Sequence, residues 1–174
     1  MAAPRAQRLG PQSGSIVVRT YREGVAAKVG HDLVLDVTRW EATFEPETIE
    51  LTADPRSLEV REGLRGVKPL TDKDRAEIRR NIDEKVLGAE PIAFRSSGVD
   101  RSGGRLSIQG DLTMAGNTRP VTAQLDVDPG GRITGNIALR QSAWGIKPYR
   151  GLMGALKVRD EVDVEIDVRV TGEP

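Results

Sequence analysis

The sequence is poor in the residues that most metal and redox sites use. Its 174 residues include no cysteine and one histidine, His31, and aromatic residues make up only 3% of the chain. Without cysteine the chain can form neither disulfides nor thiolate metal sites. A lone histidine also gives little support for zinc, which several protein ligands usually hold together. We therefore expect neither a metal site nor a bound cofactor.

Charge of one sign is not in excess either. The chain carries 26 basic and 26 acidic residues, so that its formal net charge is zero. A protein that binds nucleic acid needs a surplus of Lys and Arg to neutralise phosphates. We therefore expect no nucleic-acid partner.

Long hydrophobic runs are missing as well. No stretch approaches the roughly 20 apolar residues of a membrane helix, and the first fourteen residues lack the apolar core of a secretion signal. From this composition we expect residues 1–14 to be a flexible arm, residues 15–172 to be a single domain, and the protein to be cytoplasmic.

The clearest positive signal is an alternation of apolar and polar residues over 106–127. The apolar members are separated by Ser, Gln, Asp and Thr, and residues 116–120 (GNTRP) are typical of a turn. A period of two places all apolar side chains on one face of a strand. The segment therefore predicts a hairpin with one wet face.

The same alternation fills residues 162–170, where Val and Ile at even positions alternate with charged residues. Parallel strands are covered on both faces and have continuous apolar runs, whereas alternation is typical of antiparallel sheets. We therefore predict an antiparallel all-β fold rather than a doubly wound α/β fold.

One segment has a helical period instead. Thr71 and Asp74 fit a capping box, Ile78, Ile82 and Val86 recur every four residues, and a glycine follows. This predicts one short α-helix over about 72–87. The remaining segments predict about eight strands in hairpin succession, with a β-bulge near Arg39 where the alternation slips. Eight antiparallel strands can close into a barrel that is filled by side chains or holds one small ligand.

Three segments, in this order, resemble one protein family. They are residues 90–96 (EPIAFRS) after the expected helix, residues 110–121 (GDLTMAGNTRPV), and residues 142–146 (SAWGI) with the closing 158–162 (VRDEV). Together they resemble the YceI-like family over most of residues 15–170. The resemblance implies a lipocalin-like barrel that binds a polyisoprenoid or similar lipid without catalysing a reaction. It also leaves a homodimer open.

A ligand site follows from the barrel and the resemblance together. We expect the barrel lining to include Leu33, Leu35, Val37, Phe44, Phe94, Leu112, Met114, Ile137, Leu139 and Trp144, and the rim or head-group site to include His31, Lys147, Tyr149 and Arg150. Two alternatives stay open. Small inward residues such as Gly110 and Gly135 either leave a cavity or only let strands pack closely, and Trp144 is either a rim residue or a core anchor.

Two other functions compete with a lipid carrier. One is a packed barrel that acts as a protein-interaction or stress-response module, with the helix of residues 72–87 as its docking element. The weaker one is an enzyme in which His31 and Asp32 exchange protons near neutral pH. No nucleophile motif accompanies His31, so that a structural histidine is the preferred interpretation.

Overall fold

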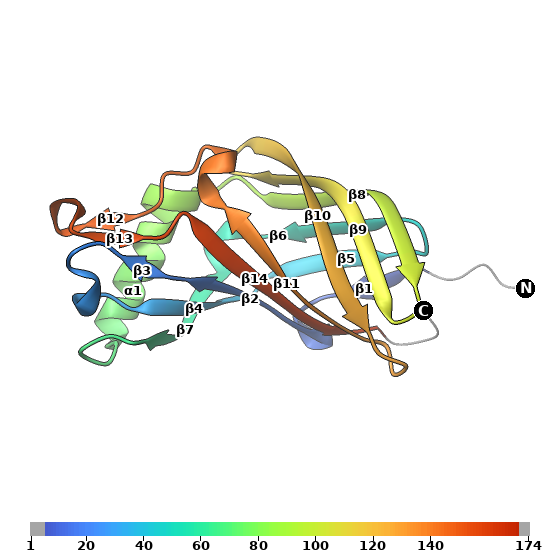
Figure 1. Ribbon diagram of the computed structural model, residues 1–174, viewed down its shortest axis with the longest axis horizontal. Coiled ribbons are helices and arrows are strands. Elements are labelled where there is room, and N and C mark those ends of the chain that lie inside the picture. The colour runs from blue at the N-terminus through green and yellow to red at the C-terminus, as the bar shows by residue number, and fades with distance from the viewer. Residues whose placement is uncertain (1–5, 171–174) are drawn as a thin grey trace, which may run out of the picture.

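Antiparallel strands make up most of residues 6–170, which the computed structural model describes (Figure 1). Eleven of these strands form one sheet in the order β1-β5-β6-β8-β9-β10-β11-β14-β2-β4-β7. Their bounds are β1 (Gln7–Leu9), β2 (Gly14–Thr20), β4 (Asp32–Val37), β5 (Trp40–Phe44), β6 (Ile49–Ala53), β7 (Leu58–Leu64), β8 (Ile92–Ser102), β9 (Arg105–Met114), β10 (Asn117–Val127), β11 (Arg132–Arg140) and β14 (Glu161–Arg169). A smaller sheet contains β12 (Arg150–Gly151), β13 (Leu156–Val158) and β3 (Arg22–Glu23).

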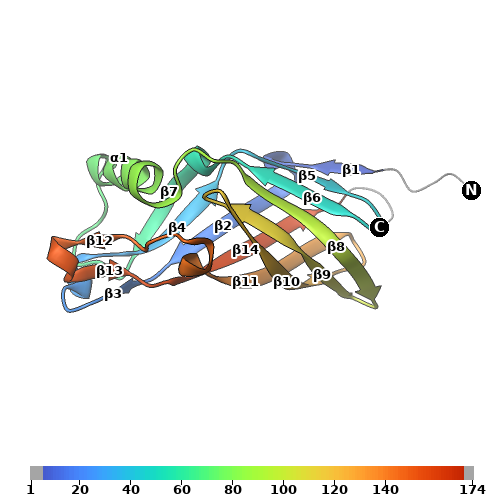
Figure 2. The same cartoon turned by 90° about the horizontal axis from the view of Figure 1, so that it is seen from above.

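The large sheet curls into a lipocalin-like barrel (Figure 2). Strands β1 and β2, β4 and β5, and β6 and β7 follow each other along the chain with only short interruptions. Strand β2 pairs with β4 while β1 pairs with β5, and β4 pairs with β7 while β5 pairs with β6. Each of these three interruptions divides one expected strand into two, which is why the sheet has eleven strands rather than the expected eight. Each interruption is a bend that lets a long strand turn around the core.

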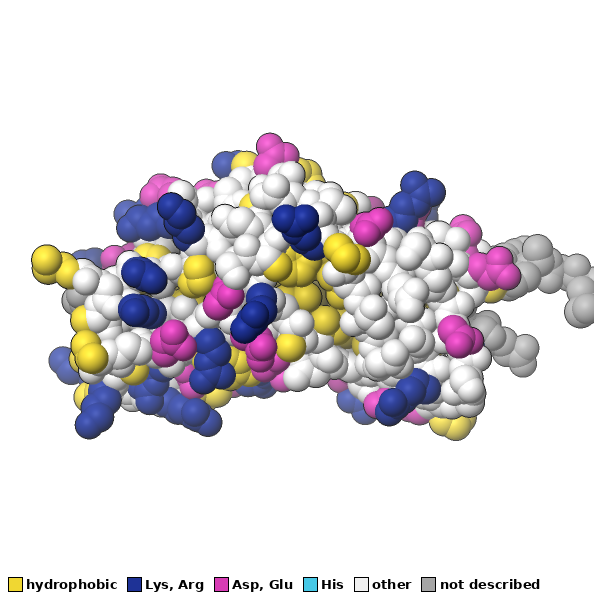
Figure 3. Space-filling view, turned by 45° about the horizontal axis from the view of Figure 1, so that its top comes forward, with side chains coloured by type: hydrophobic (Ala, Val, Ile, Leu, Met, Phe, Trp, Pro, Cys, Tyr) yellow, Lys and Arg dark blue, Asp and Glu magenta, His cyan; other side chains and the backbone are white. Residues whose placement is uncertain are grey.

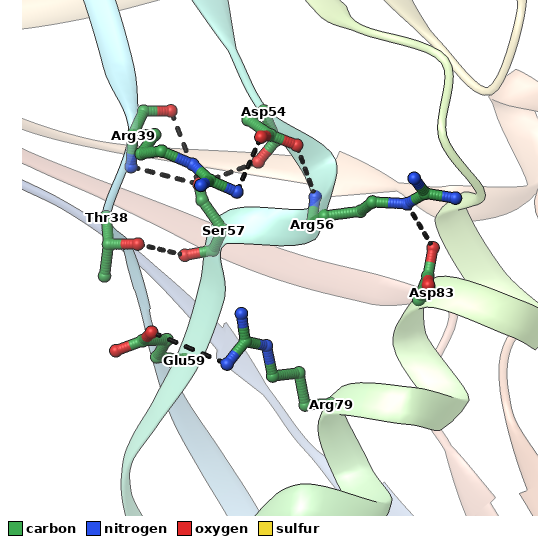
Figure 4. A network of polar contacts seen from close by, with 8 residues as sticks. All are labelled: Thr38, Arg39, Asp54, Arg56, Ser57, Glu59, Arg79 and Asp83. Carbon is green, nitrogen blue, oxygen red and sulfur yellow. Dashed lines mark hydrogen bonds and ion pairs between the residues drawn. The ribbon is translucent and has the colours of Figure 1, made fainter.

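A buried serine holds the bend between β4 and β5 against the one between β6 and β7 (Figure 4). Ser57 is 1% exposed, and its Oγ accepts from the Arg39 amide at 3.0 Å and donates to the Asp54 carbonyl at 2.7 Å. The Thr38 hydroxyl donates to the Ser57 carbonyl at 2.7 Å. The slip in alternation near Arg39 is therefore a break between two strands. The irregularities of register lie elsewhere, at Val34–Leu35 in the pairing of β4 with β7 and at Ser96–Gly98 in the pairing of β8 with β9.

The hairpin of β9 and β10 confirms the clearest sequence signal, with a correction to its turn. The turn is Ala115–Gly116, both with positive φ (49° and 77°), which is the geometry that favours tight hairpins. Residues 117–120, expected in the turn, are the start of β10. Pro120 is tolerated there because β10 pairs with β11 only at Asp126 and Val127, so that its missing amide breaks no ladder bond on that side.

The expected helix is confirmed within its predicted bounds. It consists of α1 (Asp72–Asn81) and a π-helical continuation, η4 (Ile82–Leu87), and Gly88 follows with a φ of 69°. Thr71 and Asp74 form the predicted capping box. The helix lies across one end of the barrel, where the Arg75 guanidinium donates to the Val60 carbonyl at 2.7 Å. Within residues 6–170, no helix combines the length and the apolar character that crossing a membrane requires.

Part of the segment expected to be a flexible N-terminal arm forms secondary structure. Residues 7–9 form β1, whose register pairs Leu9 with Ala42, and Leu9 is part of the hydrophobic core. The 3₁₀ turn η1 (Pro11–Ser13) then leads into β2. Strand β1 has one apolar side chain in three residues and is too short to show alternation in the sequence. Only its pairing with β5 identifies it as a strand. Residues 1–5 and 171–174 of the predicted arm and domain lie outside the described residues.

Candidate ligand-binding hollow

The inside of the barrel has two halves that differ in exposure. In the packed half, apolar side chains from all around the sheet fill the interior, and the cavity left between Phe44, Leu106, Ile133 and Val170 has a volume of about 10 Å³. That is about the space of a single water molecule. The packed half is formed by Leu35, Val37, Trp40, Ala42, Leu106, Ile108, Ala123, Leu125, Val127, Ile133, Val168 and Val170, all buried.

In the open half, side chains on the same inward face remain partly exposed. Because a side chain that points into a barrel is exposed only where solvent enters, this half is open to solvent, although residues such as Val18, Val164 and Ile166 still pack against the core with part of their surface. Figure 3 shows hydrophobic side chains gathered in a hollow in the middle of the displayed face. The open half is formed by Val18, Leu33, Ile92, Phe94, Leu112, Met114, Val121, Ile137, Leu139, Val164 and Ile166, all of intermediate exposure.

The hollow adjoins a seam between β10 and β11, which the 3₁₀ turn η5 (Gln141–Trp144) spans. Beyond their two paired positions these strands diverge, and side chains replace the missing ladder. Trp144 donates from Nε1 to the Leu112 carbonyl at 2.8 Å, and Asn117 donates to the Trp144 carbonyl at 2.8 Å. Arg119 donates to the Ala143 carbonyl at 2.9 Å. The seam is therefore closed by side chains rather than by backbone pairing.

Trp144 is a buried anchor and not a rim residue. It is 4% exposed, and its indole N–H is used by the bond to β9. Of the two alternatives for this residue, the structure therefore supports the core anchor. Asn117 and Arg119, which hold the same turn, were missed by the sequence reasoning. Their place on an alternating strand gave no sign that the neighbouring strand ends its pairing there.

The two inward glycines let the sheet pack closely and leave no cavity. A Cβ on Gly110 would lie 2.5 Å from the Phe94 ring and 2.4 Å from the Arg95 carbonyl oxygen. A Cβ on Gly135 would lie 2.2 Å from a methyl of Leu125. A larger residue at either position would therefore force its neighbours apart. The small residues do not create the hollow, which instead results from the divergence of the strands.

The expected lining residues divide between the two halves. Leu35 and Val37 belong to the packed half, and Phe44 borders its small cavity. The residues of the expected lining that lie in the open half are Leu33, Phe94, Leu112, Met114, Ile137 and Leu139. Val18, Val164 and Ile166, which the alternation of their strands also predicts to face inward, lie there as well.

The expected rim residues contact different partners. Lys147 and Tyr149 lie between η5 and β12, Arg150 begins β12, and the ammonium of Lys85, in η4, lies 5.7 Å from the centre of the Tyr149 ring. This contact joins the helix to that segment. The Nε2 of His31 lies 2.6 Å from the Lys68 carbonyl oxygen, in the loop that precedes α1.

His31 and Asp32 are each engaged by other partners. The His31 ring fills the space beside Gly66, where a Cβ would lie 1.9 Å from its Nε2. Asp32 is buried, accepts from the Arg22 amide at 2.8 Å, and pairs with Arg65 at 3.5 Å. The structure therefore gives this pair a structural role at the start of β4. Within residues 6–170, His, Asp and Glu side chains form no cluster of three or more that could hold a metal.

The outer face of β2, β11 and β14 carries charges that pair with one another. Arg132 contacts Asp167 through two hydrogen bonds of 2.9 and 2.7 Å, which lower the pKa of Asp167 below its usual value. Tyr21 donates to Asp163, and this bond, with burial, raises the pKa of the Tyr21 hydroxyl. An open surface hollow of about 400 Å³ lies beside Arg132 and Asp167. Because these charges are already paired, the interior hollow is the better ligand site.

Solved structures similar to this chain support the fold. The crystal structure of BcnA from Burkholderia cenocepacia aligns with a TM-score of 0.61 and 18% identity, over 90% of this chain and 96% of that one. A mutant YceI protein from Campylobacter jejuni aligns with a TM-score of 0.51 and 8% identity, over 100% and 89% of the two chains. No curated protein matches the chain.

These distant structures show only that the fold is shared, whereas a family model shows the family to which the chain belongs. The model of the YceI-like domain matches residues 13–170, which is nearly the whole described chain and contains the three segments singled out in the sequence. The chain therefore belongs to the YceI-like family.

Proposed function

We propose that the protein binds a long-chain lipid of the isoprenoid type in the open half of its barrel, and that it does so as a carrier or sequestering protein rather than as an enzyme. The observation that carries this proposal is the exposure of inward apolar side chains such as Leu112, Ile137 and Val164. Exposed apolar surface of this kind is typical of ligand grooves. Membership of the YceI-like family supports the same function.

The chain of the lipid supplies most of the affinity. Burying a hydrocarbon contributes about 0.8 kcal/mol per carbon, so that each five-carbon unit contributes about 4 kcal/mol before ordering costs. A charge-assisted hydrogen bond to a head group contributes only about 1.5 to 3 kcal/mol. Lys147, Tyr149 and Arg150 are the candidates to contact a polar head and orient the lipid.

Native mass spectrometry of delipidated protein incubated with a polyprenol tests the proposal. We expect one added mass of the polyprenol per chain. A Val164→Trp variant fills the hollow beside Val18 and Ile137, its paired neighbours, and should lose this adduct. Thr122→Trp adds the same ring on the exposed outer face of β10 and is the matched control. A folded protein that takes up no polyprenol, or equal uptake by both variants, would overturn the proposal.

A packed barrel that serves as an interaction module is the second candidate, and the small cavity of about 10 Å³ in the packed half favours it. In that case α1 would present Arg80, since Arg79 already pairs with Glu59 at 3.8 Å. The same polyprenol experiment distinguishes the interaction module from the lipid carrier. A module binds no polyprenol, and its Arg80→Glu variant loses a protein partner while Val164→Trp keeps it.

A further inference from the structure

The large hydrophobic residues that are exposed within residues 6–170 all lie at one end of the barrel. Val25 and Val29 belong to the loop of residues 24–30, Leu64 and Val67 to the end of β7 and the following loop, and Met153 to the loop between β12 and β13. Val25 is 96% exposed, Val67 is 71% exposed, and Met153 is fully exposed. Single exposed apolar residues need no explanation, but a group of five confined to one end of a molecule does.

Contacts between the three loops bring these side chains to one surface. The Ala26 amide donates to the Ala155 carbonyl at 2.9 Å, which joins residues 24–30 to residues 150–157. The contact of His31 with the Lys68 carbonyl, together with the ion pair of Arg65 and Asp32, joins the loop of residues 65–70 to the start of β4. Figure 1 shows all three loops at the end of the molecule that carries α1. We call residues 24–30, 65–70 and 150–157 the tip loops.

The tip loops are basic in a chain that is neutral overall. They contain no acidic residue, and their basic residues are Lys28, Arg65, Lys68, Arg150 and Lys157. Of these, Arg65 shares its charge with Asp32, and the nearest acidic residues along the chain, Glu23 and Asp72, lie just outside the loops. Figure 3 shows dark blue and yellow side chains together at this end, on the left. Such a surface attracts a partner that is negatively charged and accepts apolar side chains.

We propose that the tip loops dock the barrel on the surface of an anionic lipid bilayer. Basic side chains are attracted to the negative surface potential of such a bilayer, and small apolar side chains at loop tips enter the boundary between head groups and acyl chains. A protein partner would more readily bury a continuous patch, whereas Val25, Val67 and Met153 project from three separate loops. Docking brings the end of the barrel beside α1 against the membrane. It goes beyond lipid binding in the open half and does not depend on it.

Sedimentation with large vesicles tests the docking surface. One set contains phosphatidylcholine and phosphatidylserine mixed three to one, the other phosphatidylcholine alone, and neither contains a polyprenol. We expect the protein to sediment with the anionic vesicles on the order of a hundredfold or more better than with the neutral ones, and added salt to weaken this binding by screening the charges. Equal sedimentation with both sets, or none with either, would overturn the proposal.

Two variants separate the apolar from the electrostatic contribution. Replacing Val25, Val67 and Met153 by Ser should weaken binding to anionic vesicles by roughly tenfold or more, because no apolar side chain then enters the boundary. Replacing Lys28, Lys68 and Lys157 by Gln should weaken it on the order of a hundredfold, at about fivefold for each charge. All six positions are outside the core, so that the urea midpoint of both variants should equal that of the wild type.

The control removes as much charge from the other end of the barrel. Arg8→Gln, Arg105→Gln and Arg169→Gln lie in β1, β9 and β14, at the end away from α1, and should leave vesicle binding within about twofold of the wild type. An equal loss in this variant would show general charge attraction and overturn the proposal. Sedimentation velocity tests whether a second copy of the chain covers the tip loops instead. A wild-type dimer that the apolar variant converts to a monomer would show that the tip loops pair two copies of the chain, and this result would also overturn docking.

Discussion

Leu106 and Leu112 lie six residues apart on β9 and both point into the barrel, but only Leu106 is fully buried, at 2% exposure. Around Leu106 the neighbouring strands keep their pairing, and their side chains interlock. Around Leu112 the sheet opens, because β10 and β11 have diverged and η5 bridges them through Trp144 and Asn117. The same residue type on the same face thus belongs to a core at one end of the strand and to a hollow at the other.

The difference teaches that the packed half supplies most of the stability, whereas the proposed lipid site lies in the other half of the same interior. The packed half holds most of the fully buried apolar side chains and therefore most of the hydrophobic stabilisation. The open half leaves apolar area in contact with water, which a ligand can cover. Substitutions should therefore act on unfolding in one half and on binding in the other.

Truncating the two leucines should have the largest and most unequal effect. We expect Leu106→Ala to lower the free energy of unfolding by about 2 to 5 kcal/mol, since it leaves a cavity in a rigid core. Leu112→Ala should cost about 1 kcal/mol, because its side chain is only partly removed from water. Urea unfolding of the two variants measures the contrast. Equal costs would mean that the interior is packed alike along β9.

Enlarging a residue in each half should have the next largest effect. Ile133→Trp overfills the packed half and should destabilise the protein by about 1 to 3 kcal/mol. Val164→Trp places the same ring in the hollow, where it should change stability by less than about 0.5 kcal/mol. Comparing the urea midpoints of the two variants with that of the wild type tests this prediction. A Val164→Trp protein as unstable as Ile133→Trp would show that the hollow has no spare room.

Removing the indole N–H at the seam should cost about 1 kcal/mol. Trp144→Phe keeps an aromatic ring but loses the bond from Nε1 to the Leu112 carbonyl, a typical buried hydrogen bond. The loss should also raise amide hydrogen exchange in η5 and in the first half of β10, while the packed half keeps its protection. Uniformly faster exchange in both halves would contradict a local role for this anchor.

Loosening the helix at the open end should have the smallest effect. Thr71→Ala removes the cap of α1 and should cost about 0.5 to 1 kcal/mol. The hydrogen bond from the Thr71 amide also holds the pKa of Asp74 below its usual 3.8. Because the folded-state pKa is lowered, this carboxylate stabilises the fold above pH 4 and loses that contribution as the pH falls through its folded-state pKa.

The pH dependence of the free energy of unfolding tests whether the Asp74 carboxylate contributes to the cap of α1. Urea unfolding of the wild type and of Asp74→Asn should differ at neutral pH and converge when the pH is lowered below about 4. A difference that stays constant over this range would mean that the Asp74 charge plays no part in capping. Lipid uptake should be little changed, because neither Thr71 nor Asp74 lies in the hollow.

Local patterns in the sequence were sufficient for the elements of this fold but not for the boundary between its halves. The helix with its capping box, the β9–β10 hairpin and the alternating last strand could be predicted because each depends on residues close in sequence. Val164 and Val168 alternate in the same way and both point inward, but only Val168 is buried. That difference depends on how far strands distant in sequence stay paired.

The roles of single residues depended on the same distant contacts. Trp144 is an anchor because the Leu112 carbonyl lies above it, and Gly135 must be small because Leu125 packs against it. His31 is held by the loop of residues 65–70, whereas Tyr149 contacts Lys85 of η4. Each of these partners lies ten or more residues away from the residue that it positions, so that no local pattern could reveal them.

The central claim is that a lipid chain occupies the open half and leaves the packed half unchanged, and methyl NMR during a polyprenol titration tests it most directly. The account predicts that the methyl resonances of Leu112, Ile137 and Val164 shift with a single saturable step, while those of Leu106, Ile108 and Ile133 stay in place. Shifts in the packed half, or no shift in the open half at saturating polyprenol, would contradict it.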